Sequence, residues 1–195
     1  TLREKLGGKC GKPLFGRDVR GMGPMGAGDL SAALWQERRQ LELLLFRLET
    51  QRLHAAAGNT HWLTFTASEV EGVLDRLRFE ALARNVESAA VAAEWGLPAQ
   101  ATLLELIAAA PQGSWPTVLQ EHLEGLRALM RRLGEAARTN EATLRSLQRP
   151  EAPDDPAGVL EQLTIAGNIE RALAITRRAT QPLLAQYLGD DANSH

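Results

Sequence analysis

The spacing of apolar residues between Leu34 and Leu77 constrains the fold of this chain more than any other feature. On a 3.6-residue helical period, leucines form one face of the first half, namely Leu30, Leu34, Leu41, Leu44, Leu45 and Leu48. Trp35, Phe46 and Leu53 fall on a second face of the same helix. A surface helix needs only one apolar face. Two faces predict either a helix in the middle of a bundle or a helix whose second face binds a partner.

A tight corner is expected after this helix. Gly58 and Asn59 both tolerate a positive φ and therefore predict the end of the helix. Thr60 then predicts the cap of a second helix, which begins at His61. Because so few residues connect the two helices, they are expected to lie antiparallel.

The first 28 residues differ in composition from the rest of the chain. They contain all three lysines and a cluster of glycines, a mixture that buries too little apolar surface to fold. We therefore expect residues 1–28 to be disordered, or to be an over-long gene start with translation beginning near Met22 or Met25. The alternative is a basic arm that touches an anionic partner.

Residues 29–149 are expected to form a bundle of long helices. The first helix begins at a cap residue, either Asp29 or Ser31. A short helix capped by Thr102 and a last long helix opened by Pro116 complete this part of the chain.

The second long helix, which is expected to end at Trp95, changes its apolar face along its length. Trp62 belongs to the apolar stripe of the first half, whereas Leu82 and Val86 lie on a rotated face. This rotation predicts a kink or a change of packing partner near residues 78–80.

The C-terminal part separates from the bundle in composition. Residues 150–158 are rich in Pro and Asp and predict a linker. Residues 159–195 form an amphipathic tail with the apolar row Val159, Leu163, Ala166, Ile169 and Leu173, extended by Leu184 and Leu188. This tail is either a fourth helix of the bundle or a clamp that becomes helical only against a partner.

These patterns together predict an all-α fold, an elongated antiparallel helical bundle or coiled coil. It consists of three long helices, a short helix and a C-terminal amphipathic helix. The composition agrees, because hydrophobic residues, supplied mostly by Leu and Ala, make up 44% of the chain and aromatic residues only 5%.

The charge and cysteine content narrow the cellular context. A formal net charge of −2 provides no global attraction to nucleic acid, and no apolar run approaches the ~18 residues of a membrane-spanning helix. Cys10 is the only cysteine, so no intrachain disulfide forms and nothing indicates an oxidising compartment. We expect a cytoplasmic protein that binds no nucleic acid and does not insert into membranes.

Residues that carry catalysis or bind metals are few and scattered. None of the histidines, His54, His61, His122 and His195, lies at ligand spacing from Cys, Asp or Glu. A di-iron bundle needs Glu-x-x-His on two helices, and the nearest match is Gln51-x-x-His54. We therefore expect no metal site, no cofactor and no enzymatic activity.

Two polar residues, His122 and Asn140, lie on the apolar stripe of the last long helix. We expect them inside the bundle, where a polar side chain fixes helix register at some cost in stability.

Residues 88–110 have the rhythm of a helix-turn-helix motif. However, residues 102–110 contain no Arg, Lys, Asn or Gln that could contact a base edge. A helix-turn-helix regulator is therefore the least favoured alternative.

Three stretches carry a resemblance to a known family. They are LWQERRQLELLLFRLETQRLHAAAGNTHWLTFTASEVEGVLDRLR, EWGLPAQATLLELIAAAP and, at the end of the last long helix, ARTNEATLRSL. The first pairs a Leu-rich helix with a Gly-polar-Thr corner and a Trp that opens the next helix. Over roughly residues 30–148 the chain resembles the FlgN-like flagellar export chaperones, particularly the actinobacterial type.

The resemblance implies a cytoplasmic, non-enzymatic chaperone. It would bind hook-associated subunits of the hook-filament junction, prevent their premature assembly and deliver them to the flagellar type III export gate. The terminal helices of such subunits would polymerise if exposed, and an apolar groove is the usual way to cover an amphipathic helix.

The resemblance also implies where the cargo binds, at the end of the third long helix and in the C-terminal segment. The candidate cargo-binding residues are Leu144, Leu147, Val159, Leu163, Ile169, Leu173, Leu184 and Leu188, and Tyr187 is the candidate contact with the export gate. A weakly bound second copy is a further expected partner. The alternative function is a generic coiled-coil scaffold or oligomerisation module without a secretion role.

Overall fold

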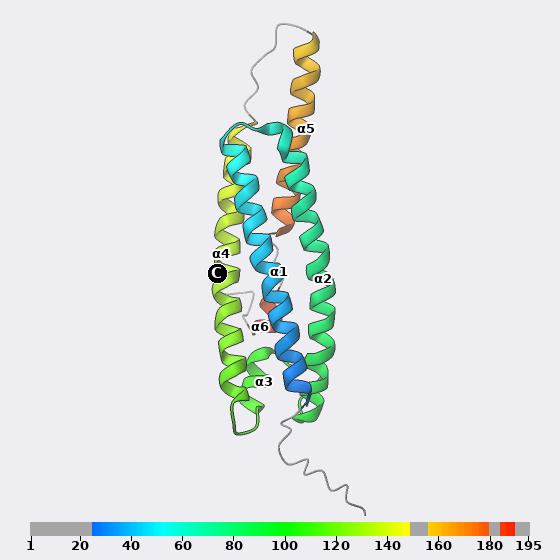
Figure 1. The fold of residues 1–195 in the computed structure, drawn as a ribbon, viewed down its shortest axis with the longest axis vertical. Coiled ribbons are helices and arrows are strands. Elements are labelled where there is room, and N and C mark those ends of the chain that lie inside the picture. The colour runs from blue at the N-terminus through cyan, green and yellow to red at the C-terminus, as the bar shows by residue number, and fades with distance from the viewer. Residues whose placement is uncertain (1–24, 149–155, 180–183, 190–195) are drawn as a thin grey trace, which may run out of the picture.

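The regular structure of this chain is helical throughout the residues that the computed structural model describes, which are 25–148, 156–179 and 184–189 (Figure 1). The prediction of an all-helical chain is confirmed. The three longest helices are α1 (Met25–Ala56), α2 (Leu63–Glu94) and α4 (Trp115–Ser146), each of 32 residues. At 1.5 Å per residue, each is about 48 Å long.

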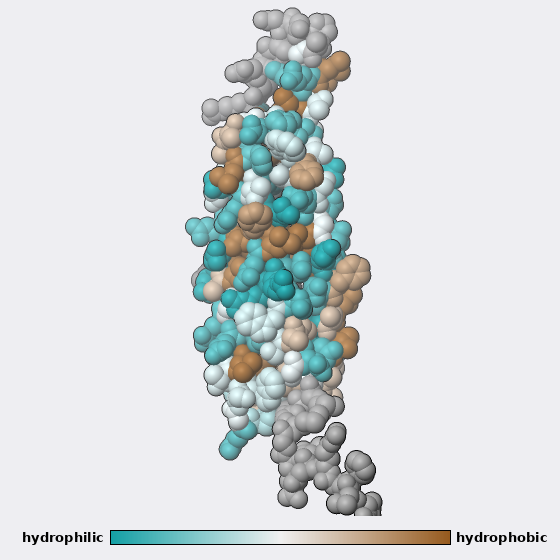
Figure 2. Space-filling model, viewed as in Figure 1, coloured by the Kyte–Doolittle hydropathy of each residue, from teal (hydrophilic) through white to brown (hydrophobic). Residues whose placement is uncertain are grey.

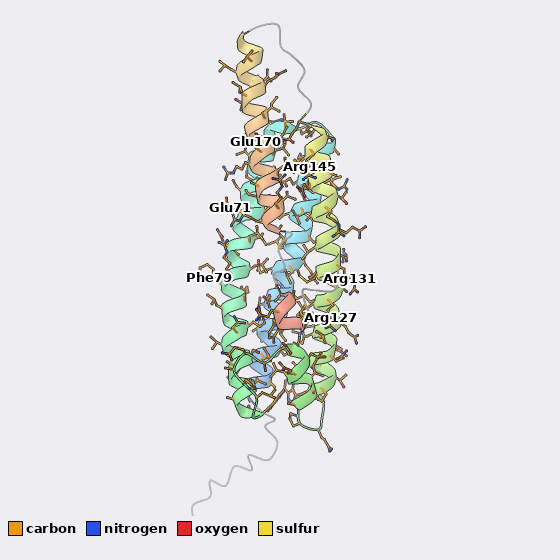
Figure 3. The ribbon with its side chains drawn as sticks, turned by 180° about the vertical axis from the view of Figure 1, so that it is seen from behind. Glu71, Phe79, Arg127, Arg131, Arg145 and Glu170 are labelled. Carbon is orange, nitrogen blue, oxygen red and sulfur yellow. The ribbon has the colours of Figure 1, made fainter. Side chains whose placement is uncertain are left out.

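The long helices lie side by side, and α1 contacts both α2 and α4. On the side opposite α1, helix α5 (Pro156–Ala179) packs in the angle between α2 and α4 (Figure 3). Two short helices, α3 (Leu103–Ala109) and α6 (Ala185–Leu188), lie on this same side toward the other end of the molecule. Helix α5 therefore covers one half of the core, whereas α3 and α6 cover the other half.

The leucine face predicted for α1 forms the centre of the core, since Leu30, Leu34, Leu41, Leu44, Leu45 and Leu48 are all buried. Burying each such side chain stabilises the fold by roughly 1.5–3 kcal/mol. The second face of α1 points to solvent, with Trp35, Phe46 and Leu53 all exposed. The sequence allowed two interpretations of this second face. The first, in which both faces of the helix are buried in the middle of a bundle, is wrong for the described residues.

Two predicted boundaries are wrong, both by a few residues. Helix α1 begins at Met25 instead of at Asp29 or Ser31, and Ala27 is completely buried, so residues 25–28 belong to the bundle. Residues 156–158, assigned to a linker, form the start of α5 because Pro is well tolerated in the first helical turn. The remaining predictions for residues 1–24 and 149–155 lie outside the described residues.

The corner between α1 and α2 is partly as predicted. Gly58 has φ +72° and ends α1, as expected for a residue without Cβ. Thr60 does not cap the next helix; it starts a 3-10 turn, η1 (Thr60–Trp62), and α2 follows at Leu63. Trp62, which was placed on the buried stripe, is exposed because this turn directs it away from the core.

Helix α2 is uninterrupted through the predicted kink region. Its buried face continues through Arg84, Ser88 and Val91, whereas Leu82 and Val86 are exposed. The rotation of the apolar stripe therefore does not mark a new packing partner among the described residues. It leaves an apolar face of α2 in solvent.

Helix α5 is a docked element of the bundle, because Ile169, Ala172 and Leu173 are buried against α2 and α4. The interpretation of the tail as a fourth helix is correct, and a clamp that stands free of the bundle is wrong. Arg178 binds Glu71 of α2 (3.0 Å) and Arg177 binds Glu141 of α4 (2.8 Å), so ion pairs flank the apolar contact on both sides.

A layer of polar side chains crosses the core between the four long helices. Asn140 of α4 donates to Gln51 of α1 (2.8 Å) and to Thr176 of α5 (3.0 Å). Thr176 in turn donates to the Gln51 Oε1 atom (3.0 Å), and Gln51 donates to Thr66 of α2 (3.4 Å). All four residues are buried. The expectation that Asn140 and His122 are buried is confirmed.

Candidate functional site

The end of α5 beyond the α1–α2 corner exposes large aliphatic side chains. Asn168 accepts a hydrogen bond from Thr64 at the start of α2 (2.6 Å), so the twelve residues before it extend about 18 Å past that level. Val159, Leu160 and Leu163 lie on this projecting part and are 43%, 69% and 64% exposed. Figure 2 shows brown, apolar patches on the projecting end of α5, among teal and white residues.

Aromatic rings gather at the adjacent corner. Trp62 lies 6.1 Å from Phe65, 5.2 Å from His61 and 6.2 Å from His54, measured between ring centroids. Trp62 and Phe65 are exposed even though they touch each other. We call the exposed residues Trp62, Phe65, Val159, Leu160 and Leu163 the apical surface, because they all lie toward the end of the molecule at which α5 contacts η1.

The local sequence explains why the corner rings point outward. Gly58 reverses the chain, and the 3-10 turn Thr60–Trp62 has about three residues per turn, so its side chains do not continue the buried stripe of α2. On α5, the inward row starts only at Ile165 and Ile169, which pack against the core. The residues before them have no helix of the described chain opposite them.

The side chains of the apical surface are of the kind that binds apolar groups. Clustered exposed apolar side chains on a protein surface mark binding sites, and aromatic rings contribute most of the energy in such contacts. The rings of the neighbouring histidines, His54 and His61, pack against Trp62 at tilted angles of 38° and 48°.

The predicted cargo-binding residues divide into two groups. Val159 and Leu163 lie on the apical surface. Leu144, Ile169, Leu173, Leu184 and Leu188 are buried in the core, and Leu147 packs partly against it. The structure therefore does not bring the whole row to one surface, because α5 uses its inward half to dock.

Tyr187, the predicted contact with the export gate, faces the bundle. Its ring lies 4.1 Å from the guanidinium of Arg84, which is held by a buried ion pair with Glu37 (2.7 Å). Burial raises the pKa of the Glu37 carboxyl, although the hydrogen bond from Arg84 opposes this shift. Burial also raises the pKa of the Tyr187 phenol. The residue thus anchors α6 on α2.

A second polar group lies between α1 and α4. His122 hydrogen-bonds Ser31 through Nε2 (2.8 Å) and packs edge-on against the Trp35 ring at 5.3 Å. Its pKa is lowered, first because burial disfavours the charged ring and second because Arg38 is nearby. The histidine is therefore a neutral hydrogen-bonding group at neutral pH.

Two residues of the apical surface, Phe65 and Leu160, were missed in the sequence. Both lie off the helical stripes that were used to find the core, and an exposed apolar residue off a stripe is common on any surface. The only available indication was that Leu160 follows Val159 directly, which places apolar residues on more than one face of α5.

Within the described residues, no His, Cys, Asp and Glu side chains gather in a group of three or more that could hold a metal ion. None of the described helices combines the length and the hydropathy needed to cross a bilayer.

Comparison with known proteins adds no relative from which a role could be transferred. The likeness to FlgN-like chaperones therefore stays a prediction from the sequence. No family model, no curated protein and no solved structure matches this chain.

Proposed function

We propose that this chain is a non-enzymatic chaperone that binds an amphipathic helix of an exported subunit at the apical surface. The long helices, as an elongated antiparallel bundle, would hold that surface at one end of the molecule. The observation that carries the proposal is the projecting end of α5, where Val159, Leu160 and Leu163 are exposed beside the aromatic corner.

The chemistry of the surface selects the class of partner. The five residues that define the apical surface are aliphatic or aromatic, with the exposed Glu161 next to them on α5, so a partner that covers these five must supply mainly apolar side chains. A helix that presents residues at i, i+3 and i+4 can cover both the corner and α5. This recognition mode suits terminal helices that must be kept from assembling.

The sequence resemblance supports a more specific form of this proposal. The cargo would be a hook-filament junction subunit, and delivery would be to the flagellar export gate in the cytoplasm. In this proposal Val159 and Leu163 keep the cargo-binding role that the sequence predicted, and Trp62, Phe65 and Leu160 join them. Leu144, Ile169, Leu173, Leu184 and Leu188 support the surface from within the core.

The proposal is tested by calorimetry with a purified junction subunit. The double substitution L160E/L163E places two carboxylates on the apical surface and is expected to weaken binding at least ~10-fold, or about 1.4 kcal/mol. Because both side chains are exposed, the melting temperature is expected to stay unchanged.

The matched control is Phe46→Glu, which alters an exposed apolar residue on the outer face of α1. It is expected to leave binding unchanged. Loss of binding in this variant alone would place the cargo on α1. If the unaltered chain binds no junction subunit, the chaperone proposal is wrong and a scaffold role takes its place.

A further inference from the structure

The outer face of α2 carries a continuous apolar row toward the end of the helix. Phe79, Leu82, Val86, Ala89 and Ala93 follow one another at spacings of 3, 4, 3 and 4 residues. This is the spacing of the a and d positions of a coiled coil. Phe79, Leu82 and Val86 are 72%, 62% and 67% exposed. We call these five residues the outer α2 row.

The outer α2 row lies on one stretch of surface that no described element covers. Figure 2 shows apolar surface along the edge formed by this half of α2, and Phe79 points away from the bundle in Figure 3. The neighbouring exposed residues Ala83 and Ala90 widen the row on one side. The row spans about 21 Å at 1.5 Å per residue.

Side-chain size changes systematically along the row. Its first end has the large residues Phe79 and Leu82, its middle has Val86, and its last end has only alanines. Helices pack closely where large side chains of one meet small side chains of the other. A second copy of the row, running in the opposite direction, supplies this match at both ends.

The charges beside the row fit the same arrangement. Arg76 flanks the end with large residues, and Glu94 flanks the end with alanines, both on the side of Ala83 and Ala90. About a two-fold axis near residue 85, Arg76 of one copy lies opposite Glu94 of the other, and this pair occurs twice. A parallel arrangement in register would instead leave Arg76 of one copy and Glu94 of the other about 27 Å apart along the helices, so that they could not pair.

We propose that two copies of this chain associate through the outer α2 row as an antiparallel helix pair about a two-fold axis near residue 85. Such an interface is isologous, so it closes at two copies and leaves no open end. Its length of about 21 Å makes it smaller than a standard interface, so the dissociation constant is expected in the micromolar range, on the order of 10–100 μM. The apical surface lies outside the contact.

Sedimentation equilibrium of the full chain up to about 500 μM tests the association. The unaltered chain is expected to form dimers, and Leu82→Glu is expected to weaken them at least ~10-fold because it places a carboxylate in the row. The L160E/L163E variant serves as the control and is expected to remain dimeric. A chain that stays monomeric throughout overturns the proposal, and so does a Leu82→Glu variant that dimerises as before.

This control also separates the two proposals. Leu82→Glu is expected to keep its affinity for the junction subunit, whereas L160E/L163E keeps the dimer and loses the subunit. Circular dichroism and the melting temperature verify that each variant is folded.

Charge exchange tests the pairing of Arg76 with Glu94. Arg76→Glu and Glu94→Arg are each expected to weaken the dimer, and the double variant R76E/E94R is expected to restore it. If the double variant dimerises as weakly as the single variants do, the antiparallel arrangement is overturned.

Oxidative cross-linking tests the direction of the helices, in a chain that also carries Cys10→Ser. Val86→Cys lies near the axis and is expected to form an intermolecular disulfide. Phe79→Cys lies six residues from the axis, about 18 Å from its equivalent, beyond the reach of a disulfide. Efficient cross-linking through Phe79→Cys would mean a parallel pair and would overturn the proposal.

Discussion

The buried polar residues decide how the packed helices are aligned with one another. Gln51, Thr66, Asn140 and Thr176 come from four different helices and hydrogen-bond one another in a single layer, in which only the Asn140 Oδ1 atom lacks a hydrogen-bond partner among the described residues. Sliding or rotating any one helix would leave buried donors and acceptors without partners, which costs about 1–3 kcal/mol per group. The layer therefore favours one alignment over the others that an all-leucine core would allow.

We predict that Asn140→Ala lowers the free energy of unfolding by about 1–3 kcal/mol, because it removes both donors to Gln51 and Thr176. Urea denaturation measures this loss. Thr139→Ala, on the exposed side of the same helix, is the control and should remain within about 0.5 kcal/mol of the unaltered chain. A similar loss in both variants would show that the layer contributes nothing specific.

His122 introduces a pH dependence with a definite sign. Its pKa in the folded chain is lowered by burial and by Arg38, so below its ordinary value of about 6.5 the unfolded chain binds more protons than the folded one. The stability contributed by the neutral ring is thus fully present above this value and decreases as the pH falls below it. Glu121 opposes this shift by favouring the charged ring.

We predict that the melting temperature of the unaltered chain falls more between about pH 7.5 and pH 5.5 than that of His122→Gln, which cannot titrate in this range. Thermal denaturation at both values measures the difference between the two chains. Other titrating groups, such as Glu37, change the melting temperature of both chains equally, so their effect cancels in the difference. Parallel pH profiles would mean that protonation of His122 does not destabilise the fold.

Among the elements, α5 has two functionally different halves. Its second half docks on α2 and α4 through buried apolar residues, and its first half projects past the corner with exposed ones. The helix is continuous through both, so the docked half holds the exposed half in a fixed position. This rigidity lowers the entropic cost of binding compared with a tail that becomes helical on contact.

We predict that Leu173→Ala destabilises the fold by roughly 2–5 kcal/mol, whereas Leu163→Ala costs under about 1 kcal/mol. The first side chain is buried against the core and the second is exposed, although both lie on the same predicted row. Chemical denaturation of the two variants gives the comparison. Comparable losses would place Leu163 in the core and remove it from the apical surface.

At the scale of the whole molecule, α5 closes the open side of a three-helix layer. Helices α2 and α4 are linked through α1 on one side and through α5 on the other, so the core is shared by all four. Removal of α5 would uncover apolar side chains of three helices and would leave Gln51 and Asn140 without Thr176.

We predict that deletion of residues 156–195 lowers the melting temperature by at least about 6 °C, which corresponds to about 2 kcal/mol or more for a chain of this size. Differential scanning calorimetry is the measurement. A chain that starts at Met25 is the control and is expected to melt within about 2 °C of the full chain, because α1 remains whole. An unchanged melting temperature without residues 156–195 would support a tethered tail instead.

The sequence alone determined the helices and their apolar faces. Periodicity is a local property, so the leucine face of α1, the stop at Gly58 and the inward positions of His122 and Asn140 could all be predicted from neighbouring residues. The capping box formed by Thr102 and Glu105 likewise depends on residues three apart.

Only the tertiary structure decided which apolar faces are covered. The rows containing Leu82 and Leu163 match the helical period as well as the row containing Leu44 does, yet Leu82 and Leu163 are exposed and Leu44 is buried. Burial depends on whether another helix, distant in the sequence, lies opposite. The presence of an opposing helix depends on how the four helices pack around a shared core, with α5 docked on α2 and α4. The periodicity within one helix carries no information about this packing.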